Sequence, residues 1–191
     1  MGARYSICMS LIDDTLREAE KEEGELLLWI LVWSELAIFG ALLTGFMVMS
    51  LLRPEAFAAA RQHLSSGFAA LNTVILLSSG WQAALAARRR TTPLLARRPL
   101  ICAALLGVAF VGVKIVEYSG EIGFTGTEVA LALFELYFLI TGFHLLHVLF
   151  GAFILLLIAW RPSQDNIHLM TTLWHAIDLI WLVMFPIIYL A

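Results

Sequence analysis

Hydrophobic residues fill five long segments of the chain, and polar residues gather in the short stretches between them. The apolar segments cover approximately residues 26–52, 68–87, 100–118, 127–160 and 170–190. A helix rises about 1.5 Å per residue and needs about 20 apolar residues to cross the hydrocarbon core of a bilayer, so each segment is long enough to span a membrane. The pattern therefore predicts an all-α protein, a polytopic membrane bundle with five transmembrane helices.

The first 25 residues differ from the rest of the chain because acidic side chains interrupt their apolar positions. This composition predicts an acidic N-terminal tail or an interfacial helix over residues 1–25, and it does not resemble a cleavable signal peptide. Residues 26–191 contain neither a repeat of fixed period nor a low-complexity linker. We therefore expect them to form one transmembrane domain.

Composition and charge support a membrane protein and predict its orientation. Apolar residues make up 61% of the chain and charged residues only 14%, whereas soluble domains carry about 25% charge. The net charge of −3 gives no reason to expect a nucleic-acid partner. Five arginines lie in residues 88–99, and by the positive-inside rule this loop is cytoplasmic. The N-terminus is then cytoplasmic and the C-terminus periplasmic, in a bacterial inner membrane.

The fourth segment carries ionisable residues on two opposite sides of the predicted helix. At about 100° per residue, one stripe contains a histidine and the other contains glutamates. The first consists of Tyr137, Thr141, His144, Val148 and Gly151 with His147 at its edge, and the second of Glu128, Glu135 and Gly142. Both sides cannot face lipid without cost, so we expect this helix to lie between protein surfaces, either its own neighbours or another subunit.

Two other segments contain polar residues at helical spacing. Trp174, Asp178 and Trp181 form a stripe in the fifth segment, and His175 lies three residues before Asp178. Such a histidine–carboxylate pair can orient an imidazole, shuttle protons or tie helices together, and the spacing alone favours the structural tie. In the third segment, Lys114 and Glu117 are three residues apart and can pair on one face.

A metal or haem site is the other interpretation of these residues. The candidate metal ligands are Glu35, Glu135, His144, His147, His175 and Asp178. Di-iron bundles use a Glu followed three residues later by His on each of two helices, and the sequence contains no such pair. Paired haems need histidines at matching depth, whereas His144 is expected near mid-membrane and His175 near the cytoplasmic edge. We therefore expect no metal and no cofactor in this chain.

Specific motifs resemble a known family. Residues 140–152, ITGFHLLHVLFGA, resemble the signature helix of subunit III of the haem–copper oxidases, which include cytochrome c oxidase. Residues 174–181, WHAIDLIW, resemble the last helix of the same family. Shorter matches are Ser34-Glu35, the LNT of residues 71–73, and Glu117-Tyr118. The resemblance extends over about residues 26–191, in order and through all five segments.

The resemblance implies a non-catalytic accessory subunit. Family members carry no haem or copper themselves. They pack against a catalytic subunit I-like haem–copper protein, which holds haem and copper or iron, and they hold phospholipid and sustain proton uptake. By this resemblance, Glu35 is the buried carboxyl that reacts with carbodiimides, with a proton or lipid role. The structural polar ties would be Asn72, Glu117, Glu135, His144, His147, His175 and Asp178.

The sequence also departs from the common family pattern. Full-length members have seven helices, and their first two, which form the far wall of the lipid-holding cleft, have no counterpart among the five segments. Lys114 stands where common members place Gln, and residues 185–189, near the end of the fifth segment, are FPIIY. These features resemble the five-helix (NorE-type) relatives associated with nitric oxide reductases, and the alternative is a subunit of a bacterial terminal oxidase.

Two functions of other classes stay open at this point. One is a free-standing membrane conductor of protons or small solutes that uses Glu35 and the membrane histidines. The other is an intrinsic metalloenzyme.

Overall fold

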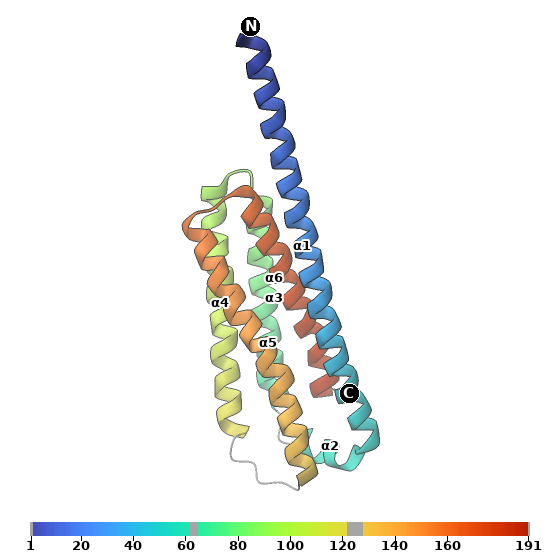
Figure 1. The fold of residues 1–191 in the computed structure, drawn as a ribbon. Helices are drawn as coiled ribbons and strands as arrows, with labels where there is room; N and C mark the ends of the chain where they lie inside the picture. The colour runs from blue at the N-terminus through green and yellow to red at the C-terminus, as the bar shows by residue number, and fades with distance from the viewer. Residues whose placement is uncertain (1, 62–64, 122–127, 191) are drawn as a thin grey trace.

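The computed structural model describes residues 2–61, 65–121 and 128–190, and the regular structure in them is helical throughout. The helices, labelled in Figure 1, are α1 (Gly2–Leu52), α2 (Pro54–Arg61), α3 (Ser66–Arg88), α4 (Pro93–Glu121), α5 (Glu128–Trp160) and α6 (Gln164–Phe185). A π-helical turn, Pro186–Leu190, continues α6. The connections 62–64 and 122–127, and the side chains of residues 1–14, 16–21, 56, 59–61, 121 and 128–134, lie outside the described residues, so that the predicted position of Glu128 is not described.

Among the described residues, five helices are long and apolar enough to cross a membrane. These candidate spans are Glu22–Leu52, Ser66–Arg88, Pro93–Gly120, Glu135–Trp160 and Gln164–Leu190. The predicted fold class, an all-α bundle with five transmembrane helices, is therefore confirmed.

The five long helices lie roughly side by side, with α1 on the outside of the bundle (Figure 1). α4 packs against α3 and α5, and α6 packs against the same two helices. α1 packs mainly against α6 and has fewer contacts with α5. Its N-terminal part projects beyond the other helices, and α1 continues as one helix from Gly2 to Leu52 instead of separating into a tail and a span.

Two helices begin earlier than their apolar segments predicted. α4 starts at Pro93, so that Arg97 and Arg98 belong to its first turns and not to a loop. Proline is well tolerated in the first turn of a helix, where its missing N–H has no partner to lose. α6 starts at Gln164, where the Ser163 hydroxyl caps the helix by accepting a hydrogen bond from the Asn166 N–H at 3.3 Å. Both helices thus extend beyond their hydrophobic part.

Candidate functional site

One face of α5 carries the polar residues of the fourth span into the interior of the bundle. The whole predicted stripe is buried: Tyr137, Thr141, His144, Val148 and Gly151. Glu135, which was predicted to lie on the opposite side, is exposed at the beginning of the span. Leu139 and Leu146 on the outer surface of α5 are also exposed. Within the described residues, this chain therefore covers only the histidine side of α5.

His144 is fully buried among aromatic rings from three other helices. Its ring stacks on Trp181 of α6, with centroids 5.5 Å apart, and makes edge contacts with Phe39 of α1 and Phe110 of α4 at 6.0 and 5.8 Å. Neither ring nitrogen has a hydrogen-bond partner in the described part of the chain. Aromatic pairs of this geometry contribute about 0.5–1.5 kcal/mol each. His144 thus acts as an aromatic packing residue that connects α5 to three helices.

A buried lysine organises the largest polar network of the described residues. The Lys114 ammonium donates to Glu117 Oε2 at 2.9 Å, to the Tyr137 hydroxyl at 2.7 Å and to the Tyr189 hydroxyl at 2.6 Å. The two tyrosine hydroxyls donate in turn to Glu117 Oε1, at 3.0 and 2.7 Å. The three N–H donors of the ammonium are thereby all used, and both carboxylate oxygens accept.

This network joins α4, α5 and the π-helical turn. The predicted pairing of Lys114 with Glu117 is confirmed, and both side chains are almost completely buried. Helical spacing did not assign the hydroxyls of Tyr137 and Tyr189 to the pair. The signal was present, because a tyrosine inside an apolar helix needs a partner for its hydroxyl. What the sequence could not supply was the partner, since Tyr189 lies 75 residues after Lys114.

Trp174 connects α6 to three other helices. Its indole N–H donates to Ser79 Oγ of α3 at 3.1 Å, and the Ser79 hydroxyl donates to the Ala103 carbonyl of α4 at 2.8 Å. The indole ring lies between two glycines, because a Cβ added to Gly107 or Gly151 would be 2.7 or 2.9 Å from ring atoms. The two glycines therefore make the space that a fully buried tryptophan needs.

The same contacts repeat seven residues away along the helices. Trp181 follows Trp174 by seven residues and donates its indole N–H to Thr73 Oγ1 of α3 at 3.1 Å. His144 precedes Gly151 by seven residues and faces Trp181 as Gly151 faces Trp174. Tyr137, a further seven residues back, belongs to the Lys114 network. The interior is thus built of successive layers, each with a tryptophan or tyrosine that is hydrogen-bonded across helices.

Asp178 lies where α6 meets α3. The residue is only 6% exposed, and a Cβ on Gly80 of α3 would come within 2.5 Å of its Oδ2. Its Oδ1 is buried without a hydrogen-bond partner in the described residues. His175 Nδ1 is 3.9 Å from Oδ2, which is too long for a hydrogen bond. The structure therefore brings the predicted pair close together, but it does not satisfy either side chain.

Glu35 and His147 form a contact between α1 and α5. Glu35 Oε2 lies 3.1 Å from His147 Nε2, but Oε2 has no hydrogen-bond partner among the described residues. His147 Nδ1 is 2.7 Å from the Phe143 carbonyl, so Nδ1 must carry a proton, because a carbonyl can only accept. Nε2 and the carboxyl can then form a hydrogen bond only when they share one further proton. The pair borders a cavity of about 160 Å³ between α1, α5 and α6.

Asn72 and Glu135 take no part in the polar contacts described above. Asn72 is completely buried on α3, and neither atom of its amide has a hydrogen-bond partner in the described residues. Glu135 is exposed, so its own helices do not tie it. No three His, Cys, Asp or Glu side chains of the described ranges come together as a metal site requires. Instead, the candidate ligands are divided among separate contacts.

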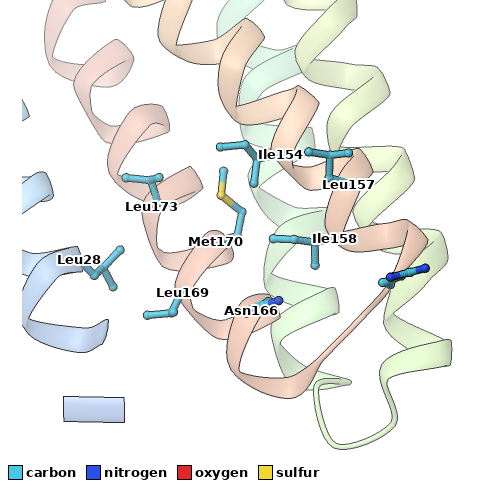
Figure 2. Close-up of a pocket in the computed structure, with 9 residues that line it drawn as sticks. Leu28, Ile154, Leu157, Ile158, Asn166, Leu169, Met170 and Leu173 are labelled. Carbon is cyan, nitrogen blue, oxygen red and sulfur yellow. The ribbon is translucent and has the colours of Figure 1, made fainter. Parts of the chain in front are cut away.

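A groove lies between the end of α5, the beginning of α6 and the middle of α1, where α5 leads into α6 (Figure 2). Its volume is about 480 Å³. Apolar side chains form most of the wall: Leu28, Ile154, Leu157, Ile158, Leu169, Met170 and Leu173. Arg161 and Asn166 are the polar residues that line it. An apolar groove with a cationic residue has the chemistry to bind an amphiphile with an anionic head.

Comparison with known proteins places these features in a family. A family model described as cytochrome c oxidase subunit III matches residues 23–191. Cytochrome c oxidase subunit 3 of Synechocystis sp. is 28% identical over 169 residues, which cover 82% of this chain and 71% of that protein. The protein of the same name from Thermostichus vulcanus is 26% identical over 175 residues, 85% of each chain. That of Pyricularia grisea is 36% identical over 132 residues, and the alignment covers 62% of this chain and 47% of that protein.

Proposed function

Because this chain belongs to the cytochrome c oxidase subunit III family, we propose that it is a non-catalytic accessory subunit of a haem–copper oxidase superfamily complex. The complex would lie in a bacterial inner membrane. The observation that carries the proposal is the family match over residues 23–191, which includes nearly all of the five candidate spans. The interior supports a scaffolding role, because its polar groups serve mainly to join the helices of this chain.

In this proposal the partner is a catalytic subunit I-like protein that holds haem and copper or iron. Glu117, His144, His147, His175 and Asp178 are structural ties within the membrane. Asn72 and Glu135 belong to the same class. Like the Asp178 carboxyl, the Asn72 amide is buried without a complete set of hydrogen-bond partners among the described residues. Glu35 is the carboxyl with a proton or lipid role, and the subunit supports proton uptake by the catalytic subunit.

Purification from the native membrane tests the proposal. A tagged chain solubilised in mild detergent should bring down a haem-bearing polypeptide in stoichiometric amount, with a visible haem spectrum. A tagged unrelated five-span protein of the same membrane provides the control. Purification of this chain without any haem protein would count against the accessory role.

Two catalytic partners fit the proposal, and they differ in metal content. The relatives compared above are all called cytochrome c oxidase subunit 3, which supports a terminal oxidase. Lys114 stands where common members place Gln, which supports the NorE-type relatives of nitric oxide reductases, and we propose this second subfamily. Copper in the co-purified complex would identify an oxidase, and non-haem iron with haem would identify a nitric oxide reductase.

We also propose that the groove of Figure 2 holds a phospholipid, with its acyl chains against the apolar wall and its phosphate near Arg161. The chain substituted Leu157→Trp, which fills the groove, should carry about half the phospholipid of the unmodified chain or less, measured by mass spectrometry of extracted lipid. Phe153→Trp is the control on the same helix, because Phe153 is exposed and does not line the groove. Equal lipid content in both variants would argue against this site.

A further inference from the structure

One ionisable side chain is exposed deep inside a candidate span. His175 lies 11 residues after Gln164 and 15 before Leu190, the ends of the fifth span, which places it about 16 and 22 Å from them. Its side chain is 46% exposed. Glu35 and His147 lie at similar depth in their spans, but they contact each other and are 19% and 23% exposed. Among the described residues, His175 is therefore the ionisable group that would meet hydrocarbon most directly.

The surroundings of His175 do not satisfy it. Asp178, the closest acidic group, is 3.9 Å away, beyond hydrogen-bond distance. Asp178 itself is nine-tenths buried and has an unpartnered Oδ1. An imidazole and a carboxyl without partners are costly in hydrocarbon, where lipid tails offer no hydrogen bonds. Such residues are found where another helix covers them.

Exposed leucines lie beside these two residues. On α6, Leu179 and Leu182 lie four and seven residues after His175, on the same side of the helix, and both are exposed. On α3, Leu77 lies three residues before Gly80, which contacts Asp178, and it is exposed as well. The lack of a side chain at Gly80 brings α3 close to α6. We define the His175 face as His175, Leu179 and Leu182 of α6 with Leu77 of α3.

We propose that the His175 face is the surface on which the catalytic subunit docks, through a transmembrane helix that offers a hydrogen-bonding side chain at the depth of His175. This inference rests on the proposed function, to which it adds the docking surface. The two leucines and Leu77 provide the apolar contact area. The histidine and the carboxyl behind it provide the polar specificity, as polar residues do between packed membrane helices.

Photo-crosslinking from two matched positions tests the proposal. A photoreactive amino acid replaces Leu179 on the His175 face or Leu149 on the outer surface of α5. The two leucines are 51% and 48% exposed, and each lies 11 residues from the nearer end of its span. In membranes that contain the whole complex, Leu179 should crosslink to the haem-bearing subunit at least fivefold more than Leu149.

The other outcomes are distinct. A crosslink to that subunit from Leu149 and not from Leu179 would overturn the docking surface and leave the proposed function intact. A crosslink from Leu179 only to a second copy of this chain, or only to lipid, would also overturn it. Failure of the proposed function is recognised separately, because no haem-bearing subunit would then co-purify with the unmodified chain.

Substitution of His175 gives a second, independent readout. A leucine at a position that faces only lipid should be harmless, so His175→Leu would leave the yield of complex unchanged if the histidine had no partner. We expect instead at least a fivefold loss of co-purified haem subunit, with an unchanged melting temperature of the isolated chain. His175→Asn, which keeps a hydrogen-bonding group, should retain most of the complex. Equal yields from the leucine variant and the unmodified chain would contradict the proposal.

Discussion

Gly107 and Gly112 lie on the same helix, but only Gly107 is tightly packed against another side chain. A Cβ at position 107 would lie 2.7 Å from a ring atom of Trp174, whereas a Cβ at position 112 would meet nothing within 4 Å. Trp174 cannot move away easily, because Gly151 of α5 holds its ring from the other side. We expect Gly107→Ala to lower the free energy of unfolding by about 1–3 kcal/mol through overpacking.

Gly112→Ala is the matched control. It adds the same methyl group to α4 and should be neutral or slightly stabilising, because alanine has the better helix propensity by about 1 kcal/mol. Thermal unfolding of both variants in the same detergent measures the difference. Equal melting temperatures for the two variants would contradict the packing of Trp174 described above.

The Lys114 network gives a second prediction at the scale of single residues. Lys114→Met leaves the Glu117 carboxylate buried with only two tyrosine hydroxyls, so we expect a loss of about 3–5 kcal/mol in the free energy of unfolding. Replacing both charges, as Lys114→Met with Glu117→Gln, should recover much of that loss, since no unpaired charge remains. A double-mutant cycle on unfolding in detergent measures the coupling. Additive losses would show that the two residues do not act as a pair.

Single residues differ in how far their role could be predicted from sequence. The Lys114–Glu117 pair and the membership of the His144 stripe of α5 follow from helical spacing, which is a local property. Which of the two stripes of α5 is buried in this chain did not follow from it. The aromatic contacts of His144 did not follow from spacing, since Phe39, Phe110 and Trp181 come from three other helices. The small size of Gly80 and Gly107 has meaning only once the facing side chain is known. Contacts between distant helices are what the pattern of one sequence does not contain.

α1 is the least embedded of the five spans. In its most apolar window 17% of the residues are buried, against 44% in the spans of α4 and α6. Among the described residues, the Glu35–His147 contact is a polar attachment of α1 to α5. His147→Leu should therefore favour local opening of α1 by about 0.5–1 kcal/mol, or roughly two- to fivefold faster amide exchange in α1.

Hydrogen exchange followed by mass spectrometry in nanodiscs measures this effect. Amides of α1 should respond, whereas those of α3 and α4 should not. Ser34→Ala is a suitable control, because the exposed Ser34 hydroxyl bonds only to the Leu31 carbonyl of its own helix. Uniform acceleration in every helix of the His147 variant would mean that the contact stabilises the whole bundle and not the attachment of α1.

The five spans could be predicted in number and kind, but less well in their limits, and the short helix α2 (Pro54–Arg61) between the first two spans was not predicted. Apolar runs identify the five spans, because the bilayer demands about 20 such residues whatever the neighbours are. The starts of α4 and α6 depend on Pro93 and on the Ser163 cap, and both lie in polar sequence that hydropathy ignores. The earlier start of α6 also places His175 deeper in its span than the apolar segment suggested. Its exposed side chain would therefore meet hydrocarbon and not the membrane surface.

At the scale of the whole molecule, the family and the orientation have different support. The resemblance seen in two helix motifs and three shorter matches is confirmed by the family model, which matches residues 23–191. The NorE-type assignment depends chiefly on Lys114 and stays a proposal. Partners cannot be identified from a membrane sequence alone, since exposed leucine suits both lipid and another subunit.

The orientation in the membrane is the last prediction. Figure 1 shows the N-terminus, the α3–α4 connection and the α5–α6 connection at one end of the bundle and the C-terminus at the other. The first end carries Arg88, Arg89 and Arg90 together with Arg97, Arg98 and Arg161, so the positive-inside rule predicts that this end is cytoplasmic. The groove that contains Arg161 would then open near the cytoplasmic surface, and the Lys114 network would lie near the periplasmic surface.

Reporter fusions test this orientation. Alkaline phosphatase fused after residue 191 should be active, and green fluorescent protein fused there should be dark. Fusions made after Arg90 should give the reverse pattern, so that each fusion site controls the other. Phosphatase activity only in the Arg90 fusion would invert the orientation and, with it, the side of the membrane on which the groove opens.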